Sequence, residues 1–318
     1  MIKSGMDISP FDLIIISGPT GVGKSEICEM LAEQWNAEII SADSQAVYRG
    51  LDIGTAKPRT GVIPYHCIDL ADPKEQFDVA RFVSCADKAV QEIRSRRRPV
   101  IMAGGTPLYI HRFLYGLSPL PGCHRAVREE LETRLQKEGA AALFNELKKC
   151  DPLTASKIHP HDHMRIIRAM EVYQVSGKSL SHWRKREKKE QRYRVLYFIL
   201  NRPRSVLYQR INQRVDMMIA RGWAEEVRKL LLQGIPTDAP ALRAVGYKEI
   251  LSYVSGEMTL DETVDTIKKK TRHFARRQLI WFRKEQGAIW IDAEEDGETV
   301  CKTIINYIKE GKDDRQRE

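Results

Sequence analysis

The chain has 318 residues, of which 42% are hydrophobic, and it carries a net charge of +9 at pH 7. This length can bury a full core and hold two domains, or one domain with a large insertion, and the basic excess makes nucleic acid a candidate partner. Six cysteines without any C-x-x-C pair argue against a zinc knuckle and a disulfide framework. We find no signal-peptide pattern and no run of about twenty apolar residues, so we expect a cytoplasmic enzyme that needs no membrane. We further expect a monomer without an obligate protein partner.

Five β-rich apolar runs lie along the chain, most of them separated by helical patterns. They cover residues 13–17, 38–42, 99–103, 193–200 and 288–291. Strands that alternate with helices usually form a parallel sheet, because each crossover helix packs on a face of that sheet. The pattern therefore predicts an α/β fold, with a P-loop NTPase-like parallel sheet flanked by helices.

The strand signal disappears between residues 117 and 191, where helical periodicity takes its place. Segments such as "AVREELETRLQKEG" and "MRIIRAMEVYQVSG" close on glycine, as helix C-termini do. We therefore expect three parts: the first part of the core over 1–116, an all-helical insertion over 117–191, and the completion of the core with strands and C-terminal helices over 192–318.

The first predicted strand is followed by a match to the phosphate-loop pattern G-x-x-x-x-G-K-[ST], which opens a helical segment. Gly21 and Gly23 allow the backbone to turn its N–H groups inward, and the helix N-terminus adds partial positive charge. Lys24 can neutralise phosphate oxygens, and Ser25 can ligate Mg²⁺. The pattern predicts binding of a diphosphate without specifying the compound that carries it. The residues of this loop are Gly18, Pro19, Thr20, Gly21, Val22, Gly23, Lys24 and Ser25.

Two further segments follow predicted strands. Asp43 follows the second strand, and Gly104-Gly105-Thr106 follows the third. Because open α/β sheets bind ligands at the carboxyl ends of their strands, both segments should lie beside the phosphate loop. Asp43 can organise magnesium, activate an acceptor hydroxyl or act as the base for an exocyclic amine, or it can simply cap the following turn. Many P-loop NTPases carry a carboxylate where this chain has glycines and Thr106, which weakens a triphosphate-hydrolysis interpretation.

Several motifs occur in a characteristic order over nearly the whole chain: "GPTGVGKS", "ISADSQAVYRGLDIGTAKP", "GGTPLYI", "GLSPLP", "DP…IHP.D..R..RA.EV...SGK", "RAVGYKEI" and "TRHFARRQLIWFR". Their combination resembles that of the bacterial tRNA dimethylallyltransferases, also called tRNA isopentenyltransferases. The resemblance implies that the loop binds dimethylallyl diphosphate. It further implies that the prenyl group passes to N6 of the adenosine just 3′ of the anticodon, in tRNAs reading codons that begin with U. No zinc-finger ligand set follows Trp281, as in the bacterial form.

The resemblance also implies roles for individual residues. Asp43 would be the general base on the adenine amine, and Thr106 would bridge substrate and diphosphate. Arg214 would lie near the diphosphate, with Mg²⁺ on Ser25. The residues implied in contacts to the tRNA anticodon stem-loop are Asp43, Ser44, Gln45, Ala46, Thr106, Arg128, Met164, Arg165, Ile166, Ile167, Arg168, Arg243, Ala244, Val245, Gly246, Tyr247, Lys248, Arg276, Arg277, Gln278 and Arg283.

Two other classes of protein remain open on the residues alone. A P-loop nucleoside or metabolite kinase would use Asp43 as base and ATP as donor. A nucleotide-gated RNA-binding protein would use the phosphate loop as a switch. Both depend on a nucleotide, whereas prenyl transfer requires none.

Overall fold

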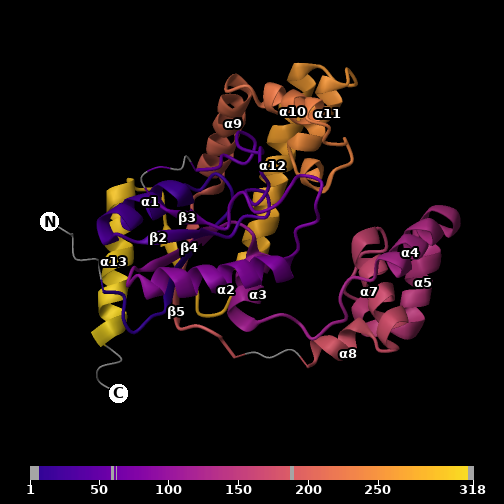
Figure 1. Cartoon of the computed structure of the whole chain (residues 1–318), viewed down its shortest axis with the longest axis horizontal. Coiled ribbons are helices and arrows are strands. Elements are labelled where there is room, and N and C mark those ends of the chain that lie inside the picture. The colour runs from indigo at the N-terminus through magenta and orange to yellow at the C-terminus, as the bar shows by residue number, and fades with distance from the viewer. Residues whose placement is uncertain (1–6, 59–60, 62, 187–189, 314–318) are drawn as a thin grey trace. The chain divides into compact units, whose positions relative to one another are not determined.

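The computed structural model describes residues 7–58, 61, 63–186 and 190–313. The chain divides into two compact units, one formed by Met1–Leu114 with Gln191–Glu318 and the other by Tyr115–Glu190 (Figure 1). The sequence places the helical insertion at 117–191, and residues 187–189 of that stretch lie outside the described part. Each unit buries its own apolar core.

The first unit is built on a six-stranded sheet in the described part of the chain, and every pairing in it is parallel. The order is β3-β2-β4-β1-β5-β6. This confirms the predicted fold class. The predicted runs contain five of the strands to within about two residues; β3 was missed because two residues are too few to produce a periodic signal. The bounds are β1 Leu13–Ser17, β2 Glu38–Ser41, β3 Tyr65–His66, β4 Val100–Gly104, β5 Val195–Asn201 and β6 Ile289–Asp292.

The register of the sheet brings several strand ends to one edge. Ser17 at the end of β1 lies beside Gly104 at the end of β4, and Ser41 at the end of β2 lies beside Ala103. The whole of β1 is buried, as expected for the central strand of a sheet covered on both faces. The loops that leave β1, β2 and β4 therefore start next to one another.

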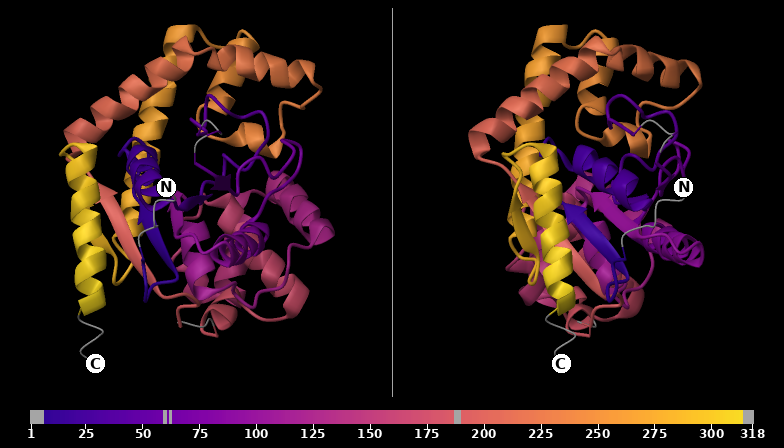
Figure 2. Two further views of the ribbon diagram at one scale, coloured as in Figure 1. Left: turned by 60° about the vertical axis from the view of Figure 1, so that its left-hand side comes forward. Right: turned by 90° about the vertical axis from the view of Figure 1, so that its left-hand side faces the viewer.

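Helices cover this sheet. α1 (Lys24–Trp35) and α13 (Gly297–Asp313) contact each other and share one apolar core with the strands. Figure 2 shows α13, in yellow, beside the strands. α2 (Val79–Ser95) contacts β2 and β4, and α3 (Pro107–Tyr115) follows β4 directly. Asp78 caps α2 by accepting a hydrogen bond from the Arg81 N–H, which explains where that helix begins.

A group of helices completes the first unit and buries a second core around Trp223, Val227 and Tyr247. α12 packs along α9, and α10 packs on α11 (Figure 1). α12 begins at a capping box formed by Thr259 and Glu262, which satisfies the first free N–H groups of that helix. The bounds are α9 Arg204–Ala220, α10 Trp223–Leu232, η1 Pro240–Arg243, α11 Tyr247–Val254 and α12 Leu260–Phe282.

Every regular element in the described residues of the second unit is a helix. Leu131, Leu147, Ile166 and Met170 are among the side chains of its core. Asp162 caps the start of one helix, and Gly177 ends it in the left-handed conformation, at a φ of 64°, as the sequence pattern indicated. The elements are α4 Arg125–Glu138, α5 Ala140–Cys150, α6 Pro152–Ala155, α7 His163–Ser176 and α8 Leu180–Arg184.

Across the described residues of both units, none of the helices has the length and apolar composition needed to cross a membrane.

Candidate active site

The phosphate loop runs from the end of β1 to the start of α1. Gly21 and Gly23 adopt φ angles of 82° and 109°, which residues with a side chain rarely adopt. Gly23 forms the N-terminal cap of α1, so the helix begins at Lys24 with its free N–H groups at the loop. Ser25 is exposed on the first turn. A loop followed by a helix N-terminus is suited to an anion, because backbone N–H groups and the helix dipole both favour negative charge.

Two arginines that the sequence analysis did not single out hold the outer side of this loop. Arg202 donates from Nε to the Val22 carbonyl at 2.9 Å, and Arg210 donates from Nε to the Gly21 carbonyl at 3.0 Å. Guanidinium groups that bind the carbonyls fix the orientation of these peptide planes, and they add positive charge behind the loop. Burial, followed by the charge of Arg210, lowers the pKa of Arg202.

Both arginines carried a signal that would have found them. Arg210 lies four residues before Arg214 on the predicted helix, and residues at that spacing share one helix face. Arg202 follows the end of β5, whose carboxyl end lies at the ligand edge of the sheet. Arg210 was therefore predictable from its spacing to Arg214, and Arg202 from its place just after a predicted strand.

Lys24 lies inside the loop. Its ammonium donates to the carbonyls of Gly18 and Pro19 at 2.9 and 2.8 Å. Burial is the main reason why the pKa of Lys24 falls to about 8, and the charge of Arg214 lowers it further, whereas Asp43 opposes the shift. An anion that binds beside Lys24 would raise this pKa again, because the negative charge favours the protonated form of the amine.

Asp43 and Thr106 lie on adjacent loops at the carboxyl ends of β2 and β4. Oδ1 of Asp43 accepts the N–H groups of Gln45 at 2.8 Å and of Ala46 at 3.3 Å, so the aspartate does cap the turn that follows it. Among the described residues, no hydrogen bond involves Oδ2 of Asp43, and this oxygen is the one that can accept a proton. Oγ1 of Thr106 accepts the Ser44 N–H at 3.0 Å, which directs the hydroxyl proton of Thr106 towards another acceptor.

Arg214 and Gln278 connect the phosphate loop to its surroundings. Arg214 donates to Oγ1 of Thr20 at 3.3 Å and to the Thr55 carbonyl at 3.2 Å. Burial lowers the pKa of Arg214, and the charge of Asp43 opposes this. Gln278 bonds the Thr20 N–H and the Gly105 carbonyl. The structure thus brings together Thr20, Lys24, Asp43, Thr106 and Arg214, residues predicted from separate motifs.

Residues 46–285 match the family model described as IPP transferase. The tRNA dimethylallyltransferase 1 of Trichlorobacter lovleyi is 45% identical over 300 residues, which cover 93% of this chain and 98% of that relative. The chain belongs to the IPP transferase family. The tRNA dimethylallyltransferase of Geobacter sulfurreducens, another relative, is 42% identical over 93% of this chain and 96% of its own length.

Solved structures agree with membership of the IPP transferase family. The full-length tRNA isopentenylpyrophosphate transferase of Bacillus halodurans is 38% identical, with a TM-score of 0.71, over 96% of this chain and 99% of that one. A eukaryotic dimethylallyltransferase described as acting on tRNA is 30% identical, with a TM-score of 0.75, over 88% of this chain and 73% of its own. The sequence identities extend the similarity beyond the fold.

The predicted tRNA segments of the first unit contain both exposed and buried residues. In "RAVGYK", Arg243, Val245 and Lys248 are exposed, whereas Gly246 and Tyr247 are buried, with Ala244 between these extremes. The hydroxyl of Tyr247 donates to Oε1 of Glu226 at 2.7 Å. On α12, Arg276 and Arg277 are exposed and Gln278 is buried, and Arg283, the C-cap of that helix, is exposed as well. The exposed cations are the ones available to RNA phosphates.

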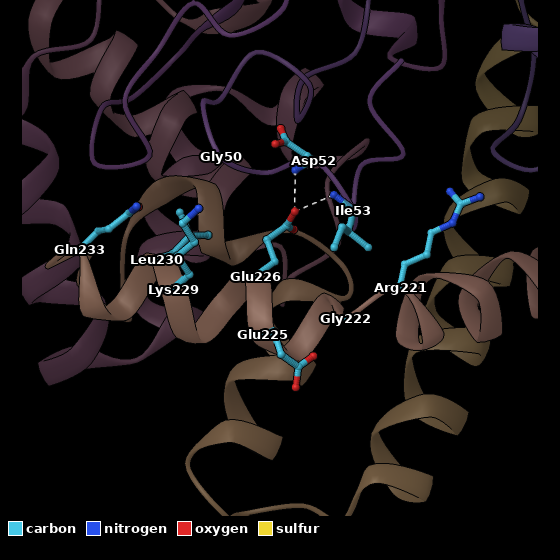
Figure 3. Close-up of a pocket in the computed structure, with 10 residues that line it drawn as sticks. All are labelled: Gly50, Asp52, Ile53, Arg221, Gly222, Glu225, Glu226, Lys229, Leu230 and Gln233. Carbon is cyan, nitrogen blue, oxygen red and sulfur yellow. Dashed lines mark hydrogen bonds between the residues drawn. The ribbon is translucent and has the colours of Figure 1, made fainter. Parts of the chain in front are cut away.

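Glu226 also lines a pocket between α10 and the loop that starts at Gly50, which Figure 3 draws. Its Oε2 accepts the N–H groups of Asp52 at 2.8 Å and of Ile53 at 2.6 Å. No residue of the phosphate loop, and neither Asp43 nor Thr106, lines this pocket. The pocket is therefore distinct from the strand-end site. Within it, Glu226 holds the loop to α10 through these two hydrogen bonds.

The predicted tRNA residues of the second unit also divide by exposure. Met164 and Arg165 are exposed on the first turn of α7, whereas Ile166 and Ile167 are buried in the core of the unit. Arg168 pairs with Glu171 at 2.8 Å and donates to the Pro121 carbonyl. Arg128, which is partly exposed, lies 3.7 Å from Glu132. Ile166 and Ile167 therefore pack in the core of the unit, and their exposed neighbours Met164 and Arg165 are the residues that RNA could contact.

Proposed function

We propose that this chain transfers the dimethylallyl group of dimethylallyl diphosphate to N6 of the adenosine 3′ of the anticodon, in tRNAs reading codons that begin with U. The products are N6-isopentenyladenosine and diphosphate. The supporting observation is the meeting of the phosphate loop with Asp43 and Thr106 at one edge of the sheet. Relatives that bear the transferase name align over more than nine tenths of the chain, which favours this function over the kinase alternative.

The transfer forms a bond between N6 and the allylic carbon and breaks the bond between that carbon and the diphosphate oxygen. Negative charge then develops on the leaving group, which the loop N–H groups, Lys24 and Arg214 would neutralise. Asp43 would accept the proton that N6 loses, through the oxygen that does not cap its turn. Thr106, whose hydroxyl proton is directed away from Ser44, would hydrogen-bond the diphosphate and so hold the donor against the base.

Mg²⁺ fits the donor side of this site. The Ser25 hydroxyl is exposed at the N-terminus of α1, and Mg²⁺ prefers oxygen ligands drawn from few protein groups, substrate phosphates and water. Among the described residues, no group of three or more His, Cys, Asp or Glu side chains could hold a metal. Ser25 would therefore be the residue that holds the ion on the protein side, together with the bound diphosphate. The ion would supply further charge neutralisation at the leaving group.

The acceptor side requires that the adenine leave its stack. A base that is stacked within a folded RNA loop does not reach the strand-end site, so we expect it to be flipped out, at a cost of about a few kcal/mol. Exposed cations of both units, among them Arg165, Lys248 and Arg277, would offset that cost by binding phosphates. The partner is thus the tRNA anticodon stem-loop.

A transfer assay with labelled dimethylallyl diphosphate and unmodified tRNA, in the absence of any nucleoside triphosphate, tests the proposal. We expect the label to enter RNA and to appear as N6-isopentenyladenosine after digestion. The matched control is an anticodon stem-loop in which only the adenosine 3′ of the anticodon is replaced by guanosine, and it should take up no label. If the label stayed in small-molecule products and did not enter RNA, the proposed function would be contradicted. Turnover that requires ATP would also contradict it, and it would favour a kinase.

A further inference from the structure

Gln278 differs from its neighbours on α12. Arg276 and Arg277 are exposed, whereas only 4% of Gln278 is. Its Oε1 accepts the N–H of Thr20 at 2.9 Å, and its Nε2 donates to the carbonyl of Gly105 at 2.5 Å. Both ends of the amide are therefore bonded to main-chain groups inside the protein, which leaves this side chain poorly placed for contact with RNA.

The two groups that Gln278 joins belong to the two sides of the site. Thr20 lies in the phosphate loop, and its hydroxyl is held by Arg214. Gly105 directly precedes Thr106, whose hydroxyl accepts the N–H of Ser44, the residue after Asp43. A continuous series of contacts thus leads from the diphosphate side to the base.

The fit around this amide is close. A Cβ atom added at Gly105 would lie 2.7 Å from Nε2 of Gln278, and 3.6 Å from the ammonium of Lys24. A side chain at position 105 would therefore push the amide away. The amide accepts one hydrogen bond and donates another. An ionised glutamate at this position could not donate to the Gly105 carbonyl, and a methionine could not donate and would accept only weakly.

We infer that Gln278 is a positioning residue for the transfer step. The inference rests on the proposed function. Through Thr20 the residue fixes the loop that holds the donor, and through Gly105 it fixes the turn that carries Thr106. It thereby sets the distance between the allylic carbon and the acceptor amine. Because a displacement of about 1 Å in a reacting pair can lower a rate roughly a hundredfold, this distance matters to the rate even though Gln278 touches neither substrate.

The test is the Gln278→Met variant, which keeps the length and apolar character of the buried stem and removes both hydrogen bonds. We expect kcat to fall by about tenfold to a hundredfold, the KM for dimethylallyl diphosphate to rise, and the Kd for tRNA to stay within about twofold. Gln91→Met makes the same chemical change at an exposed position of α2, and it should leave all three constants unchanged.

A second variant separates positioning from RNA contact on the same helix. Arg277→Ala should raise the Kd for tRNA while kcat at saturating tRNA is retained. In the double variant Gln278→Met with Arg214→Ala, the loss in the logarithm of kcat/KM should be smaller than the sum of the losses in the two single variants. We expect this because both residues act on Thr20. Additive losses in this pair would speak against a shared role in holding the loop.

The inference is overturned if Gln278→Met raises the Kd for tRNA and spares kcat and the donor KM, since this would make Gln278 an RNA contact. Unchanged constants throughout would also overturn it. If the methionine variant does not fold, Gln278→Asn keeps a buried amide but shortens its reach, and the same three constants decide. Failure of the unmodified protein to transfer the prenyl group would instead count against the proposed function.

Discussion

The strand-end site and the "RAVGYK" segment were both predicted from motifs, yet their side chains do different things. At the strand ends, Thr20, Asp43 and Thr106 have polar groups at the loop surface that can act on a ligand. In "RAVGYK", Gly246 and Tyr247 are buried, and a Cβ atom added at Gly246 would lie 2.0 Å from the ring of Trp223. The comparison teaches that residues of a family motif can serve packing as well as ligand binding. The burial of each side chain shows which of the two roles it has.

The largest expected effect lies at the strand ends. Asp43→Ala should lower kcat by about a thousandfold, within the range of general-base catalysis, with folding and tRNA affinity largely retained. Asp43→Asn is the matched variant, because an amide oxygen can still accept the N–H groups of Gln45 and Ala46 but cannot act as the base. Single-turnover transfer would distinguish the two roles. An asparagine variant with near-normal rates would mean that the aspartate only caps its turn.

The second prediction addresses packing in "RAVGYK". Gly246 and Gly256 both have positive φ angles, of 95° and 80°, but only Gly246 has Trp223 against it. Gly246→Ala should lower the free energy of unfolding by about 3 to 5 kcal/mol, and Gly256→Ala by about 1 kcal/mol. Urea unfolding followed by circular dichroism measures both. Equal losses would show that the backbone angle, and not the tryptophan, sets the cost.

The third prediction concerns the charge of Lys24. Its pKa of about 8 in the free protein should rise when a diphosphate binds beside it, so binding takes up a proton above pH 8. The Kd for dimethylallyl diphosphate without tRNA should therefore stay level below pH 8 and increase by up to about tenfold per pH unit above it. Calorimetric titrations across pH 7 to pH 9.5 would measure this. Lys24→Arg keeps its charge over this range, so persistence of the break in that variant would assign it to another group.

The sequence determined the fold more completely than the site. The buried runs of β1 and β4 produce an apolar signal by themselves, whereas the two-residue β3 depends on pairing with β2. Motif spacing located Asp43 and Thr106, because strand order places both at one edge. Spacing alone could not reveal that Gln278 points inwards while Arg277, the residue before it, points out, since that depends on how α12 packs on the phosphate loop. Burial of Ile166 and Ile167 likewise depends on the neighbouring helices.

The smallest expected effect tests whether an exposed arginine on α12 contributes more to RNA binding than an exposed arginine on α10. Arg277 is exposed on α12, and Arg228 is exposed on α10, where it pairs with Glu225 at 2.8 Å. Arg277→Ala should weaken tRNA binding by about threefold and reduce the slope of log K against log salt by about 0.7, the value for one lost phosphate contact. Arg228→Ala should change neither. Fluorescence anisotropy with labelled anticodon stem-loop between 50 and 300 mM salt measures the slope, and a common slope for both variants would show that α12 presents no particular surface to RNA phosphates.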